Sequence, residues 1–125
     1  MPLLPAGPAV IGGSAVSPDG RYGALLTIHP DSRGHPLDWL FERIDDRWSD
    51  AGGGSAGVSW NSLGSNAELG VLRYEDEAPP GASTAVVLYE GREHRAPVRE
   101  GWFLLAVWDT AYTEDPRLLG FEWAR

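Results

Sequence analysis

Glycine and proline interrupt this sequence at short intervals, and that spacing restricts the chain to short secondary-structure elements. The 125 residues include 16 glycines and 10 prolines, and the segments between them are rich in valine, leucine, isoleucine and aromatic residues. Short strands joined by turns suit such a chain, whereas long helices do not. The short spacing of glycine and proline therefore predicts an all-β fold.

Period-two alternation of apolar residues supports this prediction. On one face of segment 21–29 lie Tyr22, Ala24, Leu26 and Ile28. About eight short strands at ~8–12-residue spacing predict an antiparallel β-sandwich, and a chain of this length forms a single domain over residues 1–125. The expected strands are 10–16, 21–29, 58–60, 68–74, 83–90, 93–98, 101–108 and 117–124.

The stretch Leu37–Trp48 has two interpretations. Its apolar residues fall at helical spacing behind Pro36, which is typical of one short helix. The same stretch also fits a strand over 37–44 that turns at Asp45-Asp46 into a second strand. Its aromatic and β-branched residues favour the strand.

Two polar or glycine-rich segments are expected to be connections. Residues 51–57 contain Gly52-Gly53-Gly54-Ser55 and suit a wide hairpin loop. The acidic and proline-rich run 75–81 suits a long exposed connection, since prolines interrupt the hydrogen bonding of a strand.

Two strands are apolar on both faces. In 101–108 the residues Trp102, Leu104 and Trp108 alternate with Phe103, Leu105 and Val107, and the segment 83–89 has the same character. Because an antiparallel sandwich strand commonly has one wet face, a doubly apolar strand needs a second cover. That cover is either another part of the chain or another subunit.

The segments 85–92 and 96–105, Ala-Val-Val-Leu-Tyr-Glu-Gly-Arg and Ala-Pro-Val-Arg-Glu-Gly-Trp-Phe-Leu-Leu, resemble strand pairs of immunoglobulin-like and related small β-sandwich domains. The resemblance covers about a quarter of the chain. It implies a β-sandwich and carries no particular function, because this architecture hosts many. The Cys pair of true immunoglobulin domains is absent.

Charge and composition exclude several functions. The net charge is -8, all ten basic residues are scattered arginines, and cysteine is absent. An acidic surface repels phosphate, so neither nucleic acid nor an anionic membrane is an expected partner. No basic signal-peptide start and no apolar run of ~20 residues is present, which favours a cytoplasmic protein. No motif predicts a cofactor, a metal centre or catalytic residues.

The sequence therefore favours a non-catalytic protein-binding or self-assembly module, with a protein partner or a homo-oligomer. Candidate binding residues are Trp48, Trp60, Trp102, Phe103 and Trp108. Trp39, Trp102 and Trp123 lie in apolar segments and are expected in the core.

Two alternatives stay open. One is a small metal- or ligand-binding enzyme or barrel that uses the loop 29–38, which contains His29, Asp31, His35 and Asp38. The other is a carbohydrate-binding module that uses Trp48, Trp60 or Trp108 as a flat platform.

Overall fold

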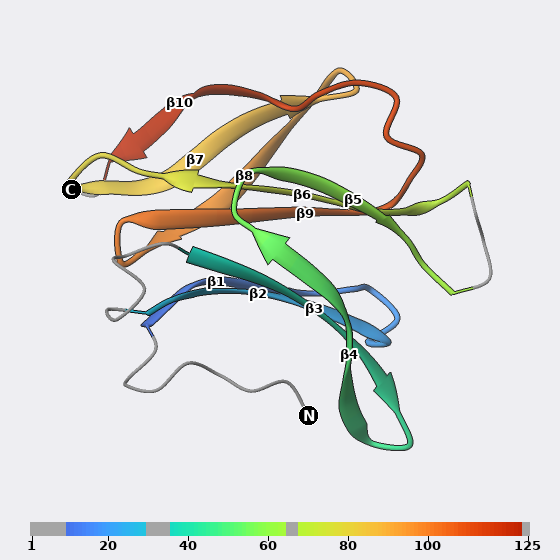
Figure 1. Ribbon diagram of the computed structural model, residues 1–125. Helices are drawn as coiled ribbons and strands as arrows, with labels where there is room; N and C mark the ends of the chain where they lie inside the picture. Colours follow the sequence, from blue (N-terminus) through green and yellow to red (C-terminus); the bar gives the residue numbers. More distant parts are fainter. Residues whose placement is uncertain (1–9, 30–35, 65–67, 124–125) are drawn as a thin grey trace.

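The fold is a stack of two antiparallel β-sheets (Figure 1). The computed structural model describes residues 10–29, 36–64 and 68–123, which form strands, turns and irregular segments without a helix. A four-stranded sheet has the order β1-β2-β3-β4, and a six-stranded sheet has the order β10-β7-β8-β9-β6-β5. The strands are β1 Val10–Val16, β2 Tyr22–Ile28, β3 Pro36–Ile44, β4 Arg47–Ser55, β5 Val58–Ser62, β6 Gly70–Glu77, β7 Ala82–Tyr89, β8 Arg92–Arg99, β9 Trp102–Thr110 and β10 Arg117–Trp123. The predicted all-β sandwich architecture is confirmed.

The ambiguous stretch 37–48 forms strands. Asp45 and Asp46 both adopt positive φ values, 51° and 64°, and connect β3 to β4 through a two-residue hairpin turn. Aspartate tolerates this conformation, and such a turn matches the twist of the strands that it joins. The helical alternative for this stretch was therefore wrong.

Two expected connections are shorter than predicted, because residues 51–55 and 75–77 belong to strands, whereas residues 56–57 and 78–81 do connect strands. The glycines of 52–54 belong to β4 and pair with Asp38, Trp39 and Leu40 of β3. The acidic residues 75–77 continue β6, where Glu75 is buried. Glycine and acidic residues have low strand propensity, but cross-strand pairing and burial override propensity here.

The six-stranded sheet bends sharply at β8. This strand pairs with β7 from Thr84↔Pro97 to Tyr89↔Arg92, but it pairs with β9 only through Val98↔Phe103 and Arg99↔Trp102. In Figure 1, β7 and β10 consequently lie above β9 and β6, while the four-stranded sheet lies below them. β9 is thus in a middle layer.

This middle position explains why β9 is apolar on both faces. Leu104 packs with Ala24 and Leu26 between the two sheets. Phe103 and Leu105 point to the other side and form a second core under the bent part of the six-stranded sheet, together with Ala85, Val87 and Ala96. The second cover of β9 therefore comes from the same chain.

β1 lies directly against β9 because Gly13 has no side chain. A Cβ atom at Gly13 would lie 2.6 Å from the Cβ of Leu104, closer than carbon atoms pack. The glycines of β1 thus allow the two sheets to approach closely at this point.

Candidate functional site

The outer face of the four-stranded sheet presents apolar side chains that no other described strand covers. Leu26, Leu40 and Asp38 point inward and are buried, whereas their neighbours along β2 and β3 point outward. The outward residues include Leu25, Trp39 and Phe41, with Val16 from β1 and Trp48 from β4. Val16 is 59% exposed and Trp48 is 49% exposed.

An apolar hollow of about 400 Å³ lies in this face, and we call it the Gly23 hollow. Gly23 forms its floor, because a Cβ atom there would lie 3.4 Å from the Trp48 ring. The absence of a side chain lets the indole of Trp48 lie close to the sheet. None of the described residues that line the hollow is ionisable. They are Ser14, Ala15, Val16, Gly23, Ala24, Leu25, Phe41 and Trp48.

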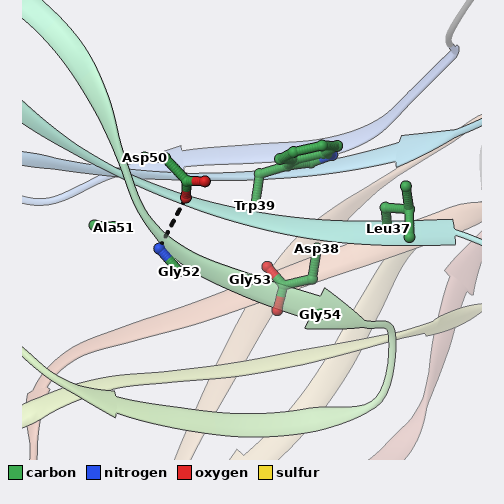
Figure 2. A pocket seen from close by; sticks show the side chains of 8 residues that line it. All are labelled: Leu37, Asp38, Trp39, Asp50, Ala51, Gly52, Gly53 and Gly54. Atoms are coloured by element: carbon green, nitrogen blue, oxygen red, sulfur yellow. Dashed lines mark hydrogen bonds between the residues drawn. The ribbon is translucent and has the colours of Figure 1, made fainter. Parts of the chain in front are cut away.

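A second, more polar depression lies further along β3 and β4, and we call it the glycine trough. Its volume is about 700 Å³, and it is lined by Leu37, Asp38, Trp39 and residues 50–54. Trp39 and Asp50 stand on one side of the two strands, whereas the Asp38 side chain points to the opposite side (Figure 2). Gly53 is the cross-strand partner of Trp39, so no neighbouring side chain on β4 covers the indole.

Hydrogen bonds and ring packing hold the Trp39 indole in place. Its Nε1–H donates to Thr27 Oγ1 at 2.7 Å, and Thr27 Oγ1 lies 2.9 Å from Nε2 of the buried His29. The ring of Phe41 is nearly parallel to the indole, at 10°, with the ring centres 6.4 Å apart. The two rings form a fixed aromatic platform beside the trough.

Gly53 is required for the trough. Its φ of 151° is rarely adopted by other residues, and an added Cβ would lie 2.3 Å from the backbone oxygen of Asp38. We expect Gly53→Ala to lower the free energy of unfolding by at least about 2 kcal/mol in urea denaturation. Gly54→Ala is the matched control, because a Cβ there meets nothing within 4 Å. Equal effects of the two substitutions would contradict the close contact.

A buried polar cluster lies on the inner side of β3. Asp38 Oδ2 accepts a hydrogen bond from Arg73 Nε at 2.8 Å, and their side chains are 1% and 2% exposed. Arg73 Nη2 also donates to Asn61 Oδ1 at 2.6 Å and to Ser59 Oγ at 3.1 Å. The Ser59 hydroxyl donates to Asp38 at 3.2 Å. The cluster thus joins β3 of one sheet to β5 and β6 of the other.

Glu75 adds a second buried carboxyl group to this cluster. Burial, the negative charge of Asp38 and a hydrogen bond with Asp38 together raise the pKa of Glu75 to about 9, against an opposing effect of Arg73. Burial also raises the pKa of Asp38, although Arg73 lowers it. With both groups ionised, Asp38 Oδ1 and the Glu75 oxygens have no hydrogen-bond donor among the described residues. A proton on Glu75 supplies one, so Glu75 is neutral at pH 7.

The ionisable side chains of the cluster are almost fully withdrawn from solvent. Asp38, Arg73 and Glu75 are each at most 2% exposed. General acid–base catalysis needs a group within hydrogen-bond reach of a substrate, and the two sheets cover almost all of these side chains, although Asp38 and Glu75 each contribute to the lining of a surface hollow. Their arrangement therefore links the sheets and leaves surface binding to the outer face.

The five candidate binding residues occupy different environments. Trp48 is exposed beside the Gly23 hollow. Trp60 is half-buried, and its Nε1–H donates to the backbone oxygen of Thr110 at 2.8 Å. Trp102 and Trp108 are half-buried and pack against the core between the sheets, and Phe103 is fully buried in the other core. The structure does not bring these residues together on one surface.

Two tryptophans expected in the core lie elsewhere. Trp39 is half-buried on the aromatic platform, and Trp123 is 57% exposed on β10. Both expectations were wrong because an apolar strand shows which residues alternate but not which of its faces meets another layer. The adjacent glycines in the partner strand were the available signal for an open indole at Trp39.

Most of the loop 29–38 lies outside the described residues, including Asp31 and His35. The two described candidate ligands of this loop, His29 and Asp38, lie on opposite faces of the sheet. His29 contacts Thr27 on the outer face, whereas Asp38 contacts Arg73 on the inner face. Within 10–29, 36–64 and 68–123, no three side chains are grouped as metal ligands.

Neither a membrane-spanning helix nor a known relative gives a further indication of function. Among the residues that the structure describes, no helix has the length and apolar character to cross a bilayer. No protein-family model, curated protein or solved structure matches the chain.

Proposed function

We propose that this domain is a non-catalytic self-assembly module, in which two copies associate through the Gly23 hollow and its rim. The observation that carries the proposal is an exposed apolar face with Trp48 and Val16 standing beside a hollow. Large exposed apolar patches on folded domains are typical of association surfaces, and Trp is enriched among residues that dominate binding. In a cysteine-free chain this assembly suits a reducing compartment, the cytoplasm.

A second copy fits this surface better than an unrelated partner. Two copies related by a two-fold axis present the same patch to each other, so the exposed Trp48 and the apolar lining of one hollow meet those of the other. The lining residues carry no charge, so association buries no unpaired ion. The net charge of -8 opposes association only at long range, where salt screens it.

Sedimentation velocity tests the proposal. We expect a monomer–dimer equilibrium that shifts toward the dimer between about 0.05 M and about 0.5 M NaCl, because screening reduces the repulsion between two acidic copies. Trp48→Ser is expected to weaken dimerisation by roughly 1,000-fold, since the two-fold dimer loses one Trp48 from each copy and each central interface tryptophan contributes about 2 kcal/mol.

Trp123→Ser is the matched control, because Trp123 is at least as exposed as Trp48 but lies on β10 of the other sheet. It should leave the equilibrium unchanged. A wild-type protein that stays monomeric at the highest attainable concentration and in high salt contradicts the proposal. So does an equal effect of the two tryptophan substitutions.

A further inference from the structure

The glycine trough combines an aromatic face with hydrogen-bond acceptors. The Trp39 indole provides the face, and the exposed Asp50 carboxylate provides the strongest acceptor. Asp50 Oδ1 accepts one hydrogen bond, from the N–H of Gly52 at 3.0 Å, as the dashed line in Figure 2 shows. β4 is also the last strand of its sheet, so its outer edge is not paired with another described strand.

Among the described residues, the trough contains no cation. None of its lining residues is basic, and Asp50 takes part in no ion pair among the described residues. The chain as a whole is acidic. A site that combines the face of an aromatic ring with an unpaired carboxylate favours a positively charged ligand that carries several hydrogen-bond donors.

The same sheet already contains such an arrangement in complete form. The guanidinium carbon of Arg21 lies 5.3 Å from the ring centre of Tyr22. Arg21 Nε and Nη2 donate to the Glu42 carboxylate at 3.0 and 2.8 Å. This guanidinium thus contacts an aromatic ring and a carboxylate at once, and Trp39 and Asp50 are the corresponding pair without a guanidinium.

We propose that the glycine trough binds a guanidinium group, which stacks on Trp39 and donates hydrogen bonds to Asp50. The planar shape of guanidinium suits stacking, and its fork of N–H groups suits a carboxylate. The platform is already held by Thr27 and Phe41, so binding requires little ordering of the indole. The side chain of an exposed arginine on a partner and a free guanidino metabolite share this chemistry.

This site can be tested separately from self-assembly. The Gly23 hollow and the glycine trough share none of their lining residues. The binding experiment is therefore done on both the wild type and the Trp48→Ser variant. Binding to the monomeric variant separates the failure of one proposal from the failure of the other.

The test is a two-dimensional NMR titration that follows the indole N–H signal of Trp39, assigned with Trp39→Phe. The ligand is N-acetyl-arginine amide, and its neutral counterpart is N-acetyl-citrulline amide. We expect a saturable shift with the arginine compound at a Kd on the order of 1 mM, as suits one exposed cation–π contact with a carboxylate. The citrulline compound should bind at least about tenfold more weakly.

Asp50→Asn should weaken arginine binding by about tenfold, whereas Asp46→Asn should not change it. Asp46 is the matched control, since it is an exposed carboxylate on the same hairpin outside the trough. A second ligand, an acetylated Thr-Thr-Arg-Thr-Thr amide, distinguishes the sources. If the peptide binds more tightly than N-acetyl-arginine amide, the natural ligand is an arginine in an extended segment of a partner protein that pairs with β4. If the two bind equally, the natural ligand is a small guanidino compound.

Three outcomes overturn the proposal. They are the absence of a saturable shift with either arginine ligand, equal binding of the citrulline compound, and equal effects of Asp50→Asn and Asp46→Asn. If methyl glucoside, rather than an arginine ligand, shifts the Trp39 indole signal, the aromatic platform binds a neutral sugar.

Discussion

Replacing Arg73 by leucine is expected to lower the free energy of unfolding by about 3–5 kcal/mol at pH 7. Arg73 is the only cation that the described structure places against Asp38, and its side chain is 2% exposed. Its removal leaves a carboxylate enclosed between the sheets and removes the donor to Asn61. Urea denaturation of the single variant measures the loss.

The double variant Arg73→Leu with Asp38→Asn separates lost charge pairing from lost packing. The amide oxygen of asparagine can still accept from the Ser59 hydroxyl, which now donates to Asp38. We expect the double variant to recover at least half of the stability lost in Arg73→Leu, because no buried charge remains unpaired. A loss below about 1 kcal/mol for the single variant, or no recovery in the double variant, would indicate that water reaches the cluster.

The second large effect is a dependence of stability on pH that originates at Glu75. Its pKa is about 9 in the folded protein and 4.5 for the ordinary group. Because the folded state holds the proton more tightly, the stabilisation is complete below about pH 4.5 and is lost as the pH rises toward 9. The expected slope is about 1.4 kcal/mol per pH unit in that range, roughly 3 kcal/mol by pH 7.

Glu75→Gln should raise the free energy of unfolding at pH 7 by up to about 3 kcal/mol and flatten the pH profile. Glutamine has the shape of the protonated side chain and takes up no proton on folding. Urea denaturation at a series of pH values compares it with Glu77→Gln, an exposed carboxyl on the same strand. A wild-type profile without a slope, or the same slope in Glu75→Gln, would show that Glu75 is ionised in the folded protein.

The repeated short segments with alternating apolar residues were enough to predict the two-sheet fold. It also predicted the Asp45-Asp46 turn, because adjacent aspartates tolerate positive φ. It was not enough to identify the strand that contains Gly52-Gly53-Gly54, since glycine favours loops unless a partner strand fixes it. Trp39 and the close approach of Asp38 fix it here.

The polar cluster could not be predicted from the sequence. Asp38 and Arg73 are 35 positions apart, and each is the type of residue that is commonly exposed. Only the stacking of β3 on β6 makes them partners. The candidate surface was predicted in part, through Trp48, whereas the trough depends on which face of β3 remains uncovered.

The middle position of β9 also determines when the chain can fold. β9 supplies Leu104 to one core and Phe103 to the other, yet its residues come late in the sequence, at 102–110. During synthesis, the apolar residues of the earlier strands in both clusters therefore remain exposed to water until β9 is made. Neither cluster can close until β9 has left the ribosome, so the growing chain depends on late, long-range contacts and stays prone to aggregation until then.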